Sequence, residues 1–139
     1  MRLEHVGSTA VPGLAAKPIV DLQVSVSEIE DRERYLGPLE RLGYLFVPDP
    51  EWPDYHFFGR PPERPRTHHV HVCQAGSGHE HRHVALRDYL RAHDDEAARY
   101  AELKRRVAAE HPGDRLAYMA GKADHMAALE RRALDWARG

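Results

Sequence analysis

The chain has 139 residues, which is enough for one domain with a single hydrophobic core and too few for two. Charged residues make up 30% of it and hydrophobic residues 42%, and the net charge of −2 argues against an extended nucleic-acid-binding surface. Cys73 is the only cysteine, and no apolar run approaches the roughly 20 residues of a membrane span. We therefore expect a cytoplasmic protein with no intrachain disulfide and no membrane partner.

The first part of the chain, residues 1–76, is predicted to be rich in strands. From Ile19 to Val26, apolar and polar residues alternate, which predicts a half-buried strand with Asp21 on its polar face. Ser27 is a suitable N-cap for a helix that ends near Gly43. Further strands are predicted at residues 2–6, 44–47, 55–58 and 68–73.

The second part, residues 77–139, has helical spacing of its apolar residues. It predicts three helices, of which the second stops at His111 and the third begins after Asp114. Strands followed by helices predict one α+β domain over residues 1–139. The first helix starts with His79, His81 and His83, which we expect to scatter around its axis in contact with solvent.

A glycine–serine pair at the end of one strand, followed by an aspartate on the next, suits phosphate binding. The small residues Gly7 and Ser8, with Thr9, allow backbone N–H groups to approach phosphate oxygens. Asp21 can hold a divalent metal such as Mg²⁺ against those oxygens, and Lys17 can add a positive charge. The alternative is an ordinary turn at Gly7-Ser8-Thr9 and a surface position for Asp21 on an edge strand.

Two histidines give a second candidate site. His69 and His71 are two residues apart in a predicted strand, so their side chains point the same way. If this strand neighbours that of Asp21, the three side chains can bind one transition metal through two imidazoles and a carboxylate. Without a metal, the histidines can donate hydrogen bonds to phosphate or act as a general base. They can also be half-exposed strand residues with no such role.

Seven segments together resemble one protein family. They are HVGSTAVPGL at residues 5–14, KPIVD at 17–21, LGY at 42–44, THHVHV at 67–72, LRDYLR at 86–91, YAELK at 100–104 and YMAGK at 118–122. In this order they resemble the GrpB-like family over almost the whole chain. The resemblance implies a nucleotidyltransferase-like fold, with a small mixed or antiparallel sheet followed by about three helices. In some bacteria a similar domain is fused to dephospho-CoA kinase.

The resemblance also implies two departures from the usual pattern. In nucleotidyltransferases a second acidic residue stands two positions after the first, where this chain has Gln23. Family members usually carry a further segment before the first strand, which here begins near Met1. Either the first strand is an edge without that cover, or the sequence is truncated at its start. In the first case we expect a homodimer, because an uncovered apolar face favours association.

The helix motifs supply further candidate phosphate ligands. Arg87, Lys104 and Lys122 each lie inside a segment that resembles a family helix, and Tyr118 shares a helix face with Lys122. Their cations can neutralise a triphosphate. The alternative is ordinary surface charge paired with nearby acidic residues.

Three functions remain open on the sequence. The favoured one is a nucleotidyltransferase-like transferase that binds a nucleoside triphosphate and a divalent metal, with Asp21, His69 and His71 as catalytic and metal-binding residues. The second is a catalytically inactive module that binds a nucleotide or stabilises a partner, which Gln23 favours. The third is a metal-dependent hydrolase built on the same three residues. The expected ligand is a nucleotide or another phosphorylated small molecule.

Overall fold

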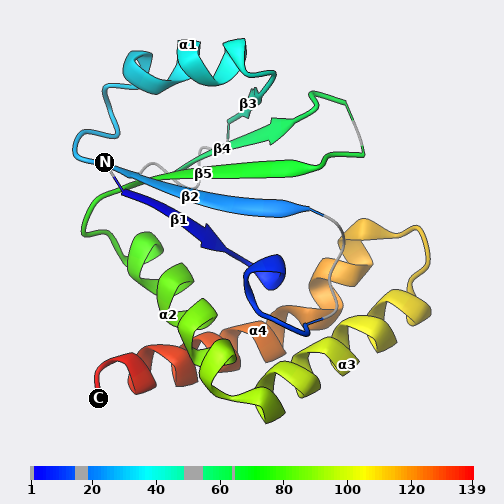
Figure 1. Cartoon of the computed structure of the whole chain (residues 1–139). Coiled ribbons are helices and arrows are strands. Elements are labelled where there is room, and N and C mark those ends of the chain that lie inside the picture. Colours follow the sequence, from blue (N-terminus) through cyan, green and yellow to red (C-terminus); the bar gives the residue numbers. More distant parts are fainter. Residues whose placement is uncertain (1, 15–18, 49–54, 64) are drawn as a thin grey trace.

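The computed structural model describes residues 2–14, 19–48, 55–63 and 65–139 (Figure 1). A five-stranded sheet comes first in the chain, interrupted by one helix, and three longer helices follow it. The strands are β1 (Arg2–Val6), β2 (Val20–Val26), β3 (Leu45–Val47), β4 (Tyr55–Arg60) and β5 (His68–Gln74). The helices are the short 3₁₀ helix η1 (Ser8–Ala10) and the α-helices α1 (Glu33–Arg41), α2 (Gly78–Ala92), α3 (Asp94–Glu110) and α4 (Arg115–Ala137).

The sheet is mixed, with the strand order β1-β2-β5-β4-β3. Its centre is the parallel pair of β2 and β5, and the other three pairs are antiparallel. The register of the parallel pair sets Asp21 opposite His69 and Gln23 opposite His71. Because residues two apart on a strand share a face, Asp21, His69 and His71 all project from the same side of the sheet.

Helix α1 covers the opposite side of the sheet, which we call the α1 face (Figure 1). Its core consists of buried Tyr44, Phe58, Val70 and Val72. Tyr35, Leu36 and Leu39 of α1 pack against this core. The burial of these apolar side chains stabilises the strands and so fixes which residues face the other way.

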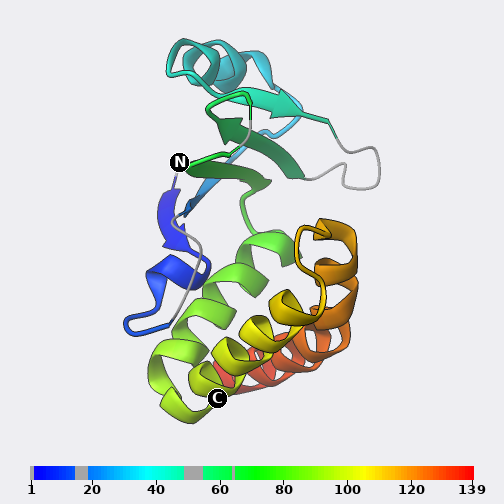
Figure 2. The same cartoon turned by 90° about the vertical axis from the view of Figure 1, so that its right-hand side faces the viewer.

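Helices α2, α3 and α4 form a separate layer on the other side, which we call the site face (Figure 2). Their core joins Tyr89 and Leu90 of α2, Tyr100 of α3, and Leu129 and Ala133 of α4. The α+β class, the mixed sheet and the three C-terminal helices predicted from the sequence are confirmed. Among the residues that the structure describes, no helix is long and apolar enough to cross a membrane.

The predicted start of the first helix was wrong. Ser27 does not cap it, because α1 begins at Glu33. The side chain of Gln74 holds the preceding segment in a non-helical form: its amide accepts a hydrogen bond from the Ile29 N–H at 2.9 Å and donates to the Ser27 carbonyl at 2.6 Å. Two backbone groups near the expected first turn are thus paired with a distant strand.

The predicted polar face of β2 is also more buried than its composition indicates. Gln23 is 0% exposed and Ser25 is 2% exposed, since the layer of helices covers both. The Gln23 amide donates a hydrogen bond to the Glu80 carbonyl in α2 at 3.2 Å. Gln23 therefore anchors the sheet to α2, in the position where the nucleotidyltransferase pattern has its second carboxylate.

Candidate metal centre and phosphate-binding cleft

Three candidate metal ligands converge on the site face. One carboxylate oxygen of Asp21, Oδ1, lies 3.2 Å from His69 Nδ1 and 2.9 Å from His71 Nε2. The potential ligand atoms of these three residues all lie within 4.8 Å of one another. Because β2 and β5 are adjacent and parallel, residues about 50 positions apart in the chain become neighbours through strand register alone.

Gly7 leaves room for the Asp21 carboxylate. A Cβ atom at position 7 would lie 2.7 Å from Asp21 Oδ2, closer than real Cβ contacts come, and the φ of Gly7 is +78°. Both the space and the backbone angle therefore require glycine here. The Gly7-Ser8 turn thus lies beside Asp21, as its predicted position requires. Its role in phosphate binding stays a prediction.

Tyr55 orients one of the histidines. Its hydroxyl lies 2.6 Å from His71 Nδ1, on the opposite side of the imidazole from Asp21. A hydroxyl can donate or accept a hydrogen bond, so it suits either neutral tautomer of His71. When Nε2 ligates a metal, the proton stands on Nδ1 and the Tyr55 oxygen accepts it, which is the outer support usual for metal-binding histidines.

The Asp21 carboxylate is strongly held in its charged form. Burial by itself would raise the pKa of Asp21, but hydrogen bonds from His69 and His71 more than offset burial, so this pKa lies well below its ordinary value of 3.8. A carboxylate that stays ionised and is only partly exposed, at 25% of its side-chain surface, is suited to a cation.

The predicted solvent exposure of the helix-start histidines was wrong for two of the three. His79 is only 7% exposed, and its ring stacks on Tyr55 and on His83, with ring centroids 4.1 and 4.2 Å apart. Burial, followed by the nearby His79 and His71, lowers the pKa of His83 to about 3, so it is neutral at pH 7. Their i, i+4 spacing puts both on the helix side that packs on the sheet, whereas His81 is exposed.

A cleft of about 610 Å³, which we call the outer cleft, opens beside Asp21 and His69. Helices α3 and α4 contribute Lys104, Arg115, Tyr118 and Lys122 to its walls. Lys104 Nζ donates a hydrogen bond to Ser8 Oγ at 2.8 Å, which links the Gly7-Ser8 turn to α3. Its volume is within the range of small-molecule sites, and its cationic side chains suit an anionic ligand.

Two tyrosines organise these cations. Lys104 Nζ lies 5.0 Å from the ring centre of Tyr100, and Lys122 Nζ lies 4.9 Å from that of Tyr118. Burial raises the pKa of Tyr100 to about 12, so its hydroxyl keeps its proton and can donate a hydrogen bond. Sequence reasoning missed both Tyr55 and Tyr100 as site residues, because only the tertiary structure brings them to Asp21.

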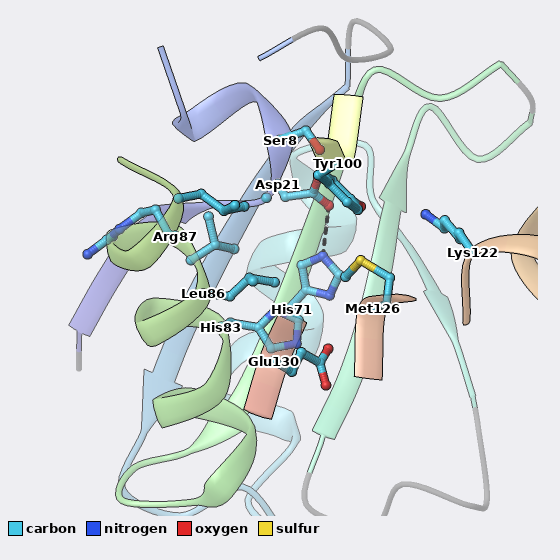
Figure 3. Close-up of a pocket in the computed structure, with 13 residues that line it drawn as sticks. Ser8, Asp21, His71, His83, Leu86, Arg87, Tyr100, Lys122, Met126 and Glu130 are labelled. Carbon is cyan, nitrogen blue, oxygen red and sulfur yellow. Dashed lines mark hydrogen bonds and ion pairs between the residues drawn. The ribbon is translucent and has the colours of Figure 1, made fainter. Parts of the chain in front are cut away.

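Other predicted phosphate ligands lie elsewhere or are engaged. The Arg87 guanidinium donates to Glu4 at 2.6 Å and to Asp88 at 2.9 Å, and it points away from the Asp21 side of the site (Figure 3). Thr9 Oγ1 lies 2.9 Å from the His5 ring. The prediction for Lys17 concerns a position outside the described residues.

The donor set fits a divalent metal. Two imidazoles and one carboxylate suit a transition metal and leave coordination positions for water or a ligand, whereas Mg²⁺ prefers oxygen donors. Gly7 gives the carboxylate its space and Tyr55 supports His71 from behind. The fold and the site thus define a small α+β domain with a candidate metal centre at the end of a cationic cleft.

Comparison with known families identifies the chain. The family model described as GrpB protein matches residues 1–132, and the chain belongs to the GrpB family. A crystal structure of the conserved protein GrpB from Enterococcus faecalis has the same fold, with a TM-score of 0.91 and 37% identity over 100% of this chain and 83% of that one.

Curated relatives agree with this assignment. A UPF0157 protein of Pseudomonas aeruginosa is 45% identical over 95% of the chain, and one from Bacillus subtilis is 36% identical over 99%. A dephospho-CoA kinase of Mycolicibacterium paratuberculosis is 32% identical over 99% of the chain, which agrees with the predicted occurrence of similar domains in such kinases. The chain spans 55%, 40% and 40% of the lengths of these three relatives.

Proposed function

We propose that this protein is a metal-dependent, nucleotidyltransferase-like enzyme that binds the phosphates of a nucleoside triphosphate or a similar phosphorylated small molecule in its outer cleft. The observation that carries the proposal is the convergence of Asp21, His69 and His71 at a cleft whose walls also carry Lys104, Arg115 and Lys122. A metal centre beside several cations suits a ligand with several negative charges.

Each group has a part in this proposal. Asp21, His69 and His71 hold the metal, which when bound supplies Lewis-acid polarisation of a phosphoryl oxygen. Ser8 and Lys104, which are hydrogen-bonded to each other, bind phosphate oxygens next to the Asp21 carboxylate. Lys122 and Arg115 neutralise further phosphate charge. Arg87 is not assigned to phosphate, because Glu4 and Asp88 occupy its guanidinium.

The proposed reaction is transfer of a nucleotidyl group to an acceptor hydroxyl. The hydroxyl oxygen forms a bond to the α-phosphorus, and the bond from this phosphorus to the oxygen that bridges to the β-phosphate breaks. Pyrophosphate then leaves, and the hydroxyl proton passes to a water molecule beside the attacking oxygen. The side chains position the two reactants and stabilise charge, which accounts for most catalysis of phosphoryl-group transfer.

Hydrolysis is the second candidate reaction, and the donor set favours it. A centre with two imidazoles and one carboxylate resembles the three-ligand arrangement of catalytic zinc sites, which keep a position open for a water molecule. Gln23 adds to this case, because a neutral amide, whose NH2 group donates to the Glu80 carbonyl of α2, cannot supply the charge of the second carboxylate of the nucleotidyltransferase pattern.

The test is turnover of labelled nucleoside triphosphates with Mg²⁺, Mn²⁺, Co²⁺ or Zn²⁺, in the presence and absence of a panel of small hydroxyl compounds. Acceptor-dependent release of pyrophosphate supports transfer, whereas acceptor-independent release of phosphate supports hydrolysis. Binding without turnover of any substrate supports the inactive module. If the protein neither binds nor turns over a triphosphate with any of the four metals, the proposal is contradicted.

Matched variants connect any activity to the site. Asp21→Ala, His69→Ala and His71→Ala are each expected to abolish metal-dependent turnover. His68→Gln is the control, since His68 is the neighbour of His69 but projects toward the α1 face and contacts Arg60 and Thr67. Equal loss of activity in the control would show that the effect is general to β5 and not specific to the metal ligands.

A further inference from the structure

A second hollow of about 230 Å³ also borders Asp21, and its lining residues come from the sheet, the Gly7-Ser8 turn and the helices (Figure 3). We call it the inner chamber. Four residues line both it and the outer cleft: Ser8, Asp21, Tyr100 and Lys122. The two hollows divide the histidine ligands, because His69 lines the outer cleft and His71 lines the inner chamber. The candidate metal centre is thus placed at their boundary.

Apolar side chains form one part of the wall of the inner chamber. Val6 and Leu90 are 1% and 4% exposed, and Leu86 and Met126 complete the apolar lining. Arg87 also lines this hollow, but its guanidinium is paired with Glu4 and Asp88 and points away from Asp21 (Figure 3). Lys122 lines both hollows, but Arg66, Lys104 and Arg115 line the outer cleft alone. A polyphosphate, which needs several cations, therefore suits the outer cleft better than the inner chamber.

Besides the metal ligands Asp21 and His71, the wall carries the polar side chains of Ser8, His83, Arg87, Tyr100, Lys122 and Glu130. His83 lines the chamber from α2, and Glu130 lines it from α4 (Figure 3). Arg82 Nε lies 3.9 Å from Glu130 Oε2, which is longer than a hydrogen bond. The chamber therefore offers a carboxylate to a ligand group that donates hydrogen bonds.

We propose that the inner chamber binds the second substrate, a small molecule with an apolar body, a hydroxyl that reaches the Asp21 boundary and an amino group that binds Glu130. This inference rests on the proposed function and adds the class of acceptor to it. The volume of about 230 Å³ limits the acceptor to a small molecule. A peptide or nucleic-acid strand does not fit a chamber of this size.

The position of the two hollows suits in-line displacement. In such a reaction the attacking oxygen and the leaving oxygen are on opposite sides of phosphorus. A triphosphate in the outer cleft would present its α-phosphorus near Asp21, and the acceptor hydroxyl would approach from the inner chamber. The new oxygen–phosphorus bond forms on the chamber side, and pyrophosphate leaves on the cleft side, where Lys104 and Lys122 neutralise it.

The experiment measures binding in each hollow separately. A library of small amino alcohols, with amines and alcohols of matched size, is screened by ligand-observed NMR against the protein with Zn²⁺ or Mn²⁺ and with a non-hydrolysable nucleoside triphosphate. Binding of metal and triphosphate is measured on the same samples by calorimetry. The variants are Glu130→Gln, which keeps side-chain volume, and Leu86→Trp, which fills the chamber. Asp135→Asn, an exposed position on the same helix, is the control.

Wild-type protein is expected to bind amino alcohols in preference to the matched alcohols. Glu130→Gln should weaken this binding about tenfold, because a charge-assisted hydrogen bond is lost. Leu86→Trp should abolish it, and neither variant should change the affinity for metal and triphosphate. The absence of any library binder, or equal binding by wild type and Glu130→Gln, would overturn the inference. If wild-type protein binds neither metal nor triphosphate, this result contradicts the proposed function, whatever the library shows.

Discussion

The two faces of the sheet carry similar tyrosine–histidine pairs in opposite surroundings. On the α1 face, Tyr35 of α1 contacts His56 of β4, with 2.5 Å between the hydroxyl and Nδ1, and the same hydroxyl donates to the Ile29 carbonyl. On the site face, Tyr55 contacts His71 Nδ1, while the other nitrogen of His71 faces Asp21. The first pair packs in a hydrophobic core, whereas the second orients His71, a candidate metal ligand.

This difference shows that one face of the sheet stabilises the fold while the other carries the candidate site. The α1 face is closed by Phe58, Val70 and Val72, which are all at most 3% exposed. The site face instead carries a carboxylate and imidazoles beneath helices that leave two hollows. Apolar burial on one side allows the other side to keep polar groups that contribute little to folding. Four predictions test this division, from the largest expected effect to the smallest.

Neighbouring phenylalanines on β4 compare the two faces directly. Phe58 is 0% exposed in the core of the α1 face, and Phe57 lines the outer cleft. Phe58→Ala is expected to lower the free energy of unfolding by about 3–5 kcal/mol, because it leaves a cavity. Phe57→Ala should cost less than half as much. Urea unfolding followed by circular dichroism measures both, and equal losses would contradict the division of roles.

Gly7 gives the next largest effect. Gly7→Ala is expected to lower the free energy of unfolding by about 2–3 kcal/mol and to displace the Asp21 carboxylate, because the added Cβ meets Oδ2 and φ is positive. Gly76→Ala is the matched control: its φ is +81°, but a Cβ there meets nothing within 4 Å. The control should lose only about 1 kcal/mol and keep full metal binding. Similar behaviour of the two variants would show that the Gly7–Asp21 contact has no special role.

Removal of one hydroxyl tests the support of His71. Tyr55→Phe is expected to weaken metal binding about tenfold with little change in stability, since the hydroxyl orients the ligand and does not bind the metal. Tyr35→Phe removes the equivalent hydroxyl on the α1 face, so it should leave metal affinity unchanged and lower stability instead. Calorimetric titration with Zn²⁺ or Mn²⁺ measures the affinities. An unchanged affinity in Tyr55→Phe would argue against this supporting role.

The smallest effect concerns the ion pair of Glu4 and Arg87. A hydrogen bond from Arg87 is the largest cause that holds the pKa of Glu4 below its ordinary value of 4.5. Because the folded-state pKa is lowered, the stabilisation is present above about pH 4.5 and is lost as the pH falls through the folded-state pKa. Glu4→Gln should therefore reduce stability by less than about 1 kcal/mol at pH 7 and by less at pH 3. Unfolding measured at both pH values checks this, and a constant difference would contradict it.

The sequence predicted most of the fold because its patterns are local. Alternation along β2 and β5 and the helical spacing after residue 77 are visible in short windows. The start of α1 was missed because Gln74, almost 50 residues away, pairs with the backbone of Ile29. No local pattern contains that contact.

The candidate site could be predicted only in part for the same reason. Asp21, His69 and His71 were grouped on the condition that their strands are neighbours, and the register of β2 and β5 brings them together. Tyr100 lies in the family-like segment at 100–104 but was not singled out as a site residue, and Tyr55 gave no signal, since an isolated tyrosine is common in any core. The cleft and chamber depend on how α3 and α4 sit over the sheet, which no single segment determines.

The central claim is that Asp21, His69 and His71 form one metal centre. The most direct test is elemental analysis of purified wild-type protein after addition of Zn²⁺ or Mn²⁺ and exhaustive dialysis, in parallel with the variant Asp21→Ala/His69→Ala/His71→Ala and the control His68→Gln. About one equivalent of metal is expected in wild type and in the control, and a background level in the triple variant. Background metal in wild type, or the same content in the triple variant, would contradict it.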